Sequence, residues 1–140
     1  MTIAERIASA DVAELWIRES LTLDLGAELT VTGTCMEPAL MDGGKIRLQP
    51  MKAPPRLGDV VLLRTLNGLR LHRVLFRSRR SIRTKGDQGA YLDPKTPDTA
   101  ILAVWESTES FATRYLRIVL SLSRLLLRVP RRFVRPASVR

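Results

Sequence analysis

The strongest constraint on the fold is the regular interruption of residues 28–105 by turn-forming residues, which leaves only short runs for regular structure. Asn67-Gly68 is the clearest of these turns, because this dipeptide favours a two-residue hairpin. Short runs bounded by Gly, Pro, Asn and Asp favour strands over helices. The sequence therefore predicts a compact, mainly β core. Strands are expected at 28–31, 45–49, 60–63 and 69–76, around Ile82, and at 100–105.

Both ends of the chain have helical periodicity rather than the alternation of a strand. Residues 2–20 place apolar side chains roughly at helical spacing, with Asp11 as the candidate cap of a second segment. Residues 111–129 carry an apolar stripe opposite a face of arginines. We therefore expect three parts: an N-terminal helical segment (1–27), a β core (28–110), and a basic amphipathic helix and tail (111–140).

The positive charge of the chain is concentrated at its C-terminal end. The formal net charge is +9. Residues 1–110 hold 15 Lys and Arg against 14 Asp and Glu, whereas residues 111–140 hold 8 Arg and no acidic residue. A basic amphipathic helix of this kind fits an anionic membrane surface. The alternative is a stripe that packs on the core with its Arg face in solvent. Nucleic acid is a disfavoured partner because aromatic stacking platforms are absent.

No targeting segment is evident in the sequence. The N-terminal region lacks a basic stretch followed by an apolar run, which argues against a secretory leader. No run of about 18 apolar residues is present. A single cysteine excludes an internal disulfide and suits a reducing compartment. We therefore expect a cytoplasmic protein, with peripheral attachment at the inner face of the membrane as a variant of that expectation.

Three residues could carry chemistry together: Cys35, His72 and Asp93. The chain has one Cys and one His, so a Cys/His zinc site of the usual kind cannot be built, and no metal or cofactor is expected. Cys35 follows a predicted strand in a Gly-containing loop, which is a poor place for an inert core thiol. A thiol, an imidazole and a carboxylate can act as nucleophile, base and orienting group without being close in sequence.

Three sequence blocks resemble the type I signal peptidase and LexA-like peptidase superfamily. Residues 31–40 (VTGTCMEPAL) match five of the six defined positions of the signature Val-x-Gly-x-Ser-Met-x-Pro-x-Leu. Residues 58–61 (GDVV) and 71–74 (LHRV) are similar to the strand pair that delivers the general base, in the endoplasmic-reticulum and archaeal type where that base is His. Residues 84–87 (TKGD), followed by Asp93, resemble the loop that completes the site.

The resemblance implies a compact signal-peptidase-like β core and an endopeptidase that cleaves a precursor or leader peptide. Cys35 would be the nucleophile, His72 the general base and Asp93 the group that orients the imidazole. The substrate would bind as an extended strand, with small residues such as Ala or Gly beside the cut. The implied oxyanion and substrate-binding groups are the backbone N–H of Cys35 together with Thr32, Gly33, Thr34 and Met36.

The chain departs from the family at the nucleophile, where Cys35 stands in place of Ser. A thiolate is the better nucleophile, and a neighbouring imidazole lowers the pKa of a thiol. The site is therefore either a working Cys–His peptidase or one decayed from a Ser ancestor, and the presence of His72 and Asp93 favours the former. The sequence has neither the apolar N-terminal anchor of signal peptidases nor the DNA-binding domain of LexA-like repressors. Two other hypotheses are a catalytically inactive peptide-binding module of the same fold and a basic membrane-surface-binding protein.

Two polar features are interpreted as structural. Gly86-Asp87 is interpreted as a turn, because a single Gly-Asp pair is weak evidence for a phosphate or metal loop. A basic stretch is interpreted as a solvated strand edge whose charges oppose aggregation. Its members are Arg77, Arg79, Arg80, Arg83 and Lys85.

Overall fold

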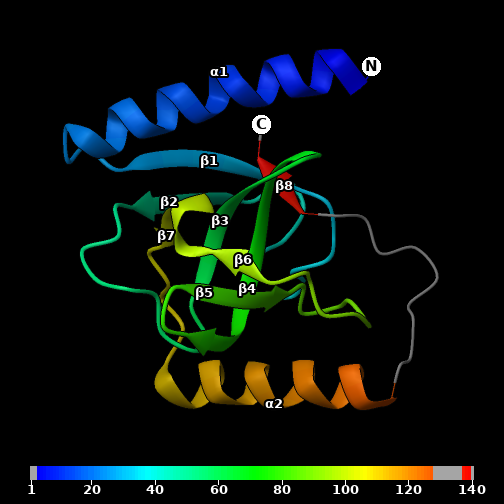
Figure 1. The fold of residues 1–140 in the computed structure, drawn as a ribbon. Coiled ribbons are helices and arrows are strands. Elements are labelled where there is room, and N and C mark those ends of the chain that lie inside the picture. Colours follow the sequence, from blue (N-terminus) through cyan, green and yellow to red (C-terminus); the bar gives the residue numbers. More distant parts are fainter. Residues whose placement is uncertain (1–2, 128–136, 140) are drawn as a thin grey trace.

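The computed structural model describes residues 3–127 and 137–139, and within them two α-helices lie on either side of an antiparallel sheet (Figure 1). The strand order is β6-β5-β4-β3-β7-β2-β1-β8. The predicted mainly β core with a helix at each end is therefore confirmed. The elements are α1 (Ile3–Thr22), β1 (Ala27–Thr32), β2 (Lys45–Gln49), β3 (Val60–Thr65), β4 (Gly68–Ser78), β5 (Ser81–Lys85), β6 (Thr96–Pro97), a 3-10 helix (Asp98–Ala100), β7 (Ile101–Trp105), α2 (Phe111–Leu127) and β8 (Ser138–Val139).

The β3–β4 hairpin lies near the centre of the sheet, and its two-residue loop is Leu66-Asn67, one position earlier than the predicted turn at Asn67-Gly68. Thr65 pairs with Gly68, and Gly68 has a φ of 110°, which a residue without a Cβ adopts at no steric cost. The apolar run 60–63 is buried along its whole length. β4 is also buried on both faces through most of its length. A strand enclosed on both sides can hold polar side chains rigidly, and two polar side chains of β4, His72 and Arg73, are buried.

Apolar side chains pack on both faces of the sheet and form two clusters. The larger cluster contains Ile17 and Leu21 of α1 together with Val31, Leu48 and Leu62. Hydrophobic burial therefore fixes α1 along this side of the sheet. The smaller cluster consists of Val61, Leu63, Val74, Ile82 and Ile101.

Helix α1 runs without a break through the position where the sequence suggested a second segment. Asp11 lies inside the helix, so the expectation that it caps a new start is wrong. Its carboxylate pairs instead with Arg64 of β3, which also lies 3.4 Å from Glu14. The Asp11 carboxylate is thus paired with a side chain of another element. It caps no helix N-terminus, because the backbone N–H groups around it bond within the helix.

Helix α2 packs on the sheet through its polar face. Arg114 donates to Asp59 at 2.8 Å, and Arg124 donates to the backbone carbonyl of Asp87 at 2.5 Å. The expectation that the Arg face is solvated while the stripe packs on the core is therefore wrong, because core carboxylates and carbonyls accept the guanidinium groups. Ile118 and Leu122 of the predicted stripe are half-buried, and Val129 lies outside the described residues.

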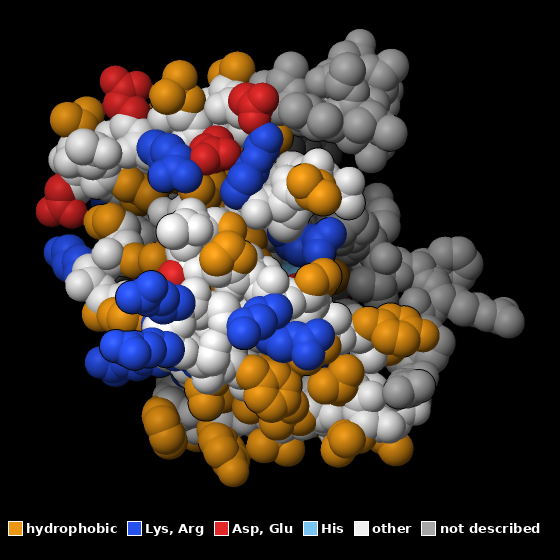
Figure 2. Space-filling view, in the orientation of Figure 1, with side chains coloured by type: hydrophobic (Ala, Val, Ile, Leu, Met, Phe, Trp, Pro, Cys, Tyr) orange, Lys and Arg blue, Asp and Glu red, His pale blue; other side chains and the backbone are white. Residues whose placement is uncertain are grey.

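The outward face of α2 is apolar. Figure 2 shows hydrophobic side chains gathered on the surface where Figure 1 places this helix. Phe111 and Leu126 are 86% and 83% exposed. No helix in the described part of the chain is both long and apolar enough to cross a bilayer. The other exposed apolar residues of α2 are Tyr115, Leu116, Val119, Leu120 and Leu127.

The last described residues return to the core. β8 extends the sheet beside β1, with Val139 opposite Val31 and Ser138 opposite Thr32. The expectation that everything after the C-terminal helix is a basic tail is therefore wrong for residues 137–139. The arginines at 128, 131, 132 and 135, on which the membrane hypothesis partly depends, lie outside the described residues.

Candidate active site

The structure brings Cys35, His72 and Asp93 together from three separate elements. Cys35 lies in the loop after β1, His72 lies in β4, and Asp93 lies in the loop between β5 and β6. Cys35 Sγ is 3.4 Å from His72 Nε2, and His72 Nδ1 contacts the Oδ2 oxygen of Asp93. The imidazole therefore bridges the sulfur and the carboxylate, one through each ring nitrogen.

The carboxylate of Asp93 is held in place by more than the imidazole. Thr84 donates a hydrogen bond to Oδ2 at 2.6 Å, and Arg70 lies 3.5 Å from Oδ1. Burial alone would raise the pKa of Asp93, but the hydrogen bonds from His72 and Thr84 and the positive charge of Arg70 outweigh it and lower the pKa. Asp93 is therefore ionised at neutral pH. Sequence reasoning did not assign Arg70 or Thr84 to the site, although Arg70 shares a strand face with His72.

Cys35 is buried, contrary to its expected place outside the core. Its side chain belongs to the larger hydrophobic cluster, and the residue is only 3% exposed. Burial raises the pKa of the thiol to about 11, and the negative charge of Asp93 acts in the same direction. A hydrogen bond from the backbone N–H of Ala137 and the charge of Arg70 lower the pKa, but by less. The thiol is therefore neutral at neutral pH in this conformation.

Gly86 lies directly against the sulfur and the imidazole. A Cβ added at this residue would lie 3.1 Å from the Cβ of Cys35 and 3.2 Å from Nε2 of His72. Contacts that close force neighbouring groups apart. The next turn of the loop binds the backbone of the cysteine, since the N–H of Gln88 donates to the carbonyl of Cys35 at 2.8 Å. The interpretation of Gly86-Asp87 as a turn is therefore incomplete, because the glycine permits the Cys–His contact.

Arg73 anchors the opposite side of β4. The residue is fully buried, and its guanidinium forms two parallel 2.8 Å hydrogen bonds with Asp87. It also donates to the carbonyl of Gly58 at 2.8 Å and to Glu109 at 3.1 Å. Side chains of neighbouring strand residues point to opposite faces, so His72 faces the sulfur while Arg73 fixes the loop after Gly86 from behind. A buried cation with two carboxylates identifies Arg73 as a positioning residue that the sequence did not reveal.

The structure gives different surroundings to each of the residues expected to bind the oxyanion and the substrate. Met36 is fully buried in the core, so the structure assigns it a packing role rather than a substrate contact. Gly33 has a φ of 93°, and its N–H donates to Asp42 at 2.8 Å, which makes it part of the turn. The hydroxyl of Thr32 lies 2.6 Å from that of Ser138 and is occupied by β8. Thr34 is half-buried and directly precedes Cys35.

Lys85 does not belong to the solvated edge that the sequence suggested. It is fully buried, and its Nζ donates to the carbonyl of Gly86 and to Ser121 of α2, both at 2.9 Å. Burial lowers the pKa of Lys85 to about 8. Strand β5 is also not an edge, because β6 pairs with it. Arg79, Arg80 and Arg83 are exposed, as expected of charges that discourage edge pairing.

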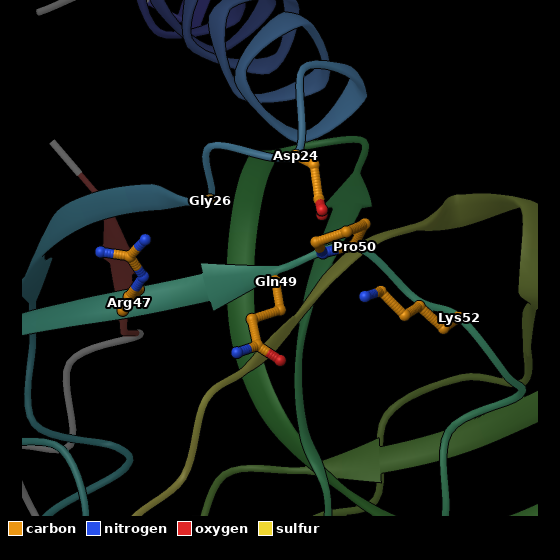
Figure 3. A pocket seen from close by; sticks show the side chains of 6 residues that line it. All are labelled: Asp24, Gly26, Arg47, Gln49, Pro50 and Lys52. Atoms are coloured by element: carbon orange, nitrogen blue, oxygen red, sulfur yellow. The ribbon is translucent and has the colours of Figure 1, made fainter.

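A polar depression of about 110 Å³ lies elsewhere on the molecule, at the end of β2 (Figure 3). Its walls come from the segment after α1 and from the start of the Pro-rich loop, and none of them belongs to the Cys35 site. The lining residues are Asp24, Gly26, Arg47, Gln49, Pro50 and Lys52. Among the described residues, no group of three or more His, Cys, Asp and Glu side chains is arranged to hold a metal ion.

The arrangement has the parts of a nucleophilic acyl-transfer site. It contains a thiol, an imidazole within reach of it and an ionised carboxylate on the other ring nitrogen. Comparison with known proteins gives no significant match to any family model, curated protein or solved structure.

Proposed function

We propose that this protein is a signal-peptidase-like endopeptidase with Cys35 as nucleophile, His72 as general base and Asp93 as orienting carboxylate. The observation that carries the proposal is the continuous contact from sulfur through imidazole to carboxylate, with 3.4 Å between Sγ and Nε2. Such a distance is within the looser range expected of a catalytic hydrogen bond before substrate binds. The three sequence blocks that resemble the peptidase superfamily contain these same residues, and the resemblance supports the assignment.

The first half of the proposed reaction transfers the acyl group to the enzyme. His72 Nε2 takes the proton of Cys35, and the sulfur forms a bond with the scissile carbonyl carbon while the C=O π electrons move to oxygen. The backbone N–H of Cys35 and the hydroxyl of Thr34 are the proposed oxyanion donors, and one donor of this kind contributes about 2.7–4 kcal/mol in a comparable case. The oxyanion then collapses, the C–N bond breaks, and the imidazolium gives its proton to the departing amine.

The second half releases the acid product. Water attacks the thioester carbon as His72 accepts a water proton, the C–S bond breaks, and the proton returns to the sulfur. Asp93 remains ionised throughout, because hydrogen bonds from His72 and Thr84 lower its pKa. Its charge stabilises each imidazolium that forms and holds the ring with Nε2 toward the sulfur.

We propose an extended peptide as the substrate, with a small residue such as Ala or Gly beside the cut. An extended chain can add to an exposed sheet edge through main-chain hydrogen bonds. The outer edge of β1 accepts a strand, since β8 pairs with it in register. The loop after Gly86 lies close to the sulfur, which favours small side chains at this point.

We also propose that the protein attaches to the inner face of a membrane through α2. The helix turns its apolar face outward, and Phe111 and Leu126 are almost fully exposed. Polar contacts to the sheet keep this face outward, because Arg114 and Arg124 bind core oxygens. An apolar helix face fixed in this way suits insertion into the boundary between headgroups and acyl chains.

The proposed activity is tested with peptides containing Ala and Gly, with products identified by mass spectrometry. Cys35→Ala and His72→Ala should each reduce hydrolysis by about 10³-fold or more, because loss of one member disables the whole relay. Thr99→Ala, at an exposed residue of the 3-10 helix, is the matched control. Cleavage that survives in Cys35→Ala at the wild-type rate contradicts the assignment of the nucleophile.

A second candidate function is a catalytically inactive peptide-binding module. The buried, neutral thiol of Cys35 favours it, because a nucleophile must reach its substrate as a thiolate. This function predicts that peptides bind at the edge of β1 and are recovered intact. Isothermal titration with the same peptides, followed by mass spectrometry of the mixture, separates binding from cleavage.

A further inference from the structure

The segment 137–139 lies directly on the candidate nucleophile. The backbone N–H of Ala137 donates a hydrogen bond to Sγ of Cys35 at 2.9 Å. Ala137 itself is fully buried. The sulfur thus contacts a peptide N–H on one side and the imidazole of His72 on the other. A peptide group of this same chain therefore occupies the space beside the sulfur.

The same segment bridges the two strands that lead to the site. On one side, Ser138 pairs with Thr32 of β1, and their hydroxyl groups lie 2.6 Å apart. On the other side, the carbonyl of Ala137 accepts a hydrogen bond from the N–H of Leu71 at 3.4 Å. Leu71 directly precedes His72 in β4. Backbone contacts on both sides of an extended segment are those that a bound peptide strand makes.

The occupied site is inaccessible to any other peptide. Cys35 is 3% exposed and His72 is 8% exposed. The atoms that cover them include Ala137, and a substrate carbonyl cannot approach the sulfur while this residue is in place. Among the described strands, β8 is the last in the sheet order, and it covers the outer edge of β1.

We propose that segment 137–139 is an intramolecular competitor that occupies the peptide-binding site in cis and must leave before a substrate peptide can bind. The inference rests on the proposed function for the identity of the competing ligand. Opening requires the loss of the hydrogen bonds made by Ala137 and Ser138, while the rest of the sheet is retained. Small terminal elements of this kind open locally at much lower cost than the whole fold.

The test measures access to Cys35 by alkylation with iodoacetamide at neutral pH. Ala137→Trp should accelerate alkylation about tenfold or more, because a Trp side chain does not fit a fully enclosed position and the open population rises. Leu66→Trp introduces the same side chain at a hairpin residue that is 95% exposed, and should leave the rate unchanged. Equal rates in wild type and a folded Ala137→Trp variant overturn the inference.

A peptide added in trans tests competition directly. The peptide with the sequence of residues 134–140 (VRPASVR) should restore protection of Cys35 in the Ala137→Trp variant. The same peptide with Trp in place of Ala should not, and failure of the unmodified peptide to protect overturns the inference. If alkylation follows the expected pattern but no variant cleaves any peptide, the proposed function fails while the occupancy of the site in cis stands.

A measurement on the unmodified chain covers the case in which Ala137→Trp fails to fold. Hydrogen exchange should find the backbone N–H of Ala137 protected, and exchange there should be faster than in β3 and β4. Saturating VRPASVR should increase the exchange of the chain's own Ala137 N–H, because the added peptide displaces the segment. An Ala137 N–H that exchanges at the rate of an unstructured peptide overturns the inference.

Discussion

The surroundings of Cys35 place its sulfur beside His72, the proposed base, and also keep the thiol protonated. The imidazole of His72 lies 3.4 Å away, yet burial raises the pKa of the thiol to about 11. Proton transfer to the imidazole separates charge, which a dry site disfavours unless Asp93 compensates. The proposed role of Cys35 as nucleophile therefore requires the groups around the sulfur to move, so that the thiolate can form.

This balance makes a prediction about pH. The folded state holds the Cys35 proton more tightly than an exposed thiol of pKa 9.0 does. The alkylation rate should therefore rise about tenfold per pH unit and continue to rise until about pH 11, because the reactive thiolate fraction increases throughout. A rate profile from pH 7 to 11, compared with a small-molecule thiol, tests it. A profile that levels off below pH 9 would contradict the burial of the thiol.

Gly86 makes a second prediction at the residue scale. In Gly86→Ala, the new Cβ lies 3.2 Å from His72 Nε2 and pushes the imidazole away from the sulfur. Peptide hydrolysis should fall about tenfold, because the neighbours must shift by a few tenths of an ångström, less than the misplacement of about 1 Å that costs about a hundredfold. Gly89→Ala is the matched control, since its Cβ meets only the carbonyl of Gly86 at an ordinary 3.4 Å. An active Gly86→Ala enzyme would mean that the site tolerates a wider Cys–His separation.

At the scale of elements, β4 carries both the proposed general base and a buried arginine that pairs with carboxylates. His72 faces the sulfur, and the next residue, Arg73, binds Asp87 and Glu109 in a fully buried position. The cation neutralises the buried carboxylate of Asp87 and also pairs with Glu109, which is half-buried. The loop that begins at Gly86 is therefore fixed to the same strand as the base.

Loss of this buried cation should cost more stability than loss of an exposed one. Arg73→Met leaves the carboxylate of Asp87 buried without its ion-pair partner, and the free energy of unfolding should fall by about 3–5 kcal/mol. Arg47→Met breaks an ion pair in which Arg47 is 60% exposed, and should cost less than about 1 kcal/mol. Urea unfolding followed by circular dichroism compares the two variants. Equal effects would show that the Arg73 network contributes no more than a surface pair.

The strands could be predicted from the sequence because each depends on local chemistry. Asn67-Gly68 indicates the hairpin between β3 and β4 to within one residue, and the alternation of Ile46 and Leu48 specifies the buried face of β2. The meeting of Cys35 with His72 has no such local cause, since 37 positions separate them. The resemblance to the peptidase superfamily predicts this contact, because its sequence blocks relate residues that lie far apart in the chain. Local periodicity cannot predict a contact of that kind.

The elements that the sequence did not reveal depend on distant partners. The amphipathic pattern of α2 indicates two faces but not which one packs, and the carboxylate of Asp59 on the sheet decides it by accepting Arg114. β8 has only two residues, too few for any periodicity, and it exists because the edge of β1 offers it hydrogen-bonding groups. Lys85 looked solvated because its buried partner, Ser121, lies on another element.

At the scale of the whole molecule, the reactive site and the apolar surface are separate. The strand that covers Cys35 extends the sheet beside β1, whereas the apolar face belongs to α2, which lies at the opposite end of the ribbon from α1 (Figure 1). A membrane bound by α2 therefore does not contact the edge of β1, which a peptide can reach once segment 137–139 has left it. Attachment and cleavage can accordingly be tested one at a time.

The apolar face predicts a selective loss of membrane binding. Phe111→Ser with Leu126→Ser removes two side chains that are 86% and 83% exposed, so thermal stability should be unchanged. Affinity for vesicles containing phosphatidylglycerol should fall roughly a hundredfold, from the loss of about 3 kcal/mol of apolar burial. Leu66→Ser, at an exposed leucine far from α2, should bind like wild type. Co-sedimentation with vesicles measures all three proteins, and equal binding would assign attachment to another surface.

The order Leu71, His72, Arg73 makes the proposed chemistry dependent on the register of one strand. Inserting one residue between Gly68 and Leu71 would turn every later side chain of β4 to the other face if the two-residue loop Leu66-Asn67 were kept. Leu71 would then take the position that faces the sulfur, and the imidazole would take the position of Arg73 beside Asp87. A loop that touches no reacting atom thus sets which side chain of β4 meets Cys35.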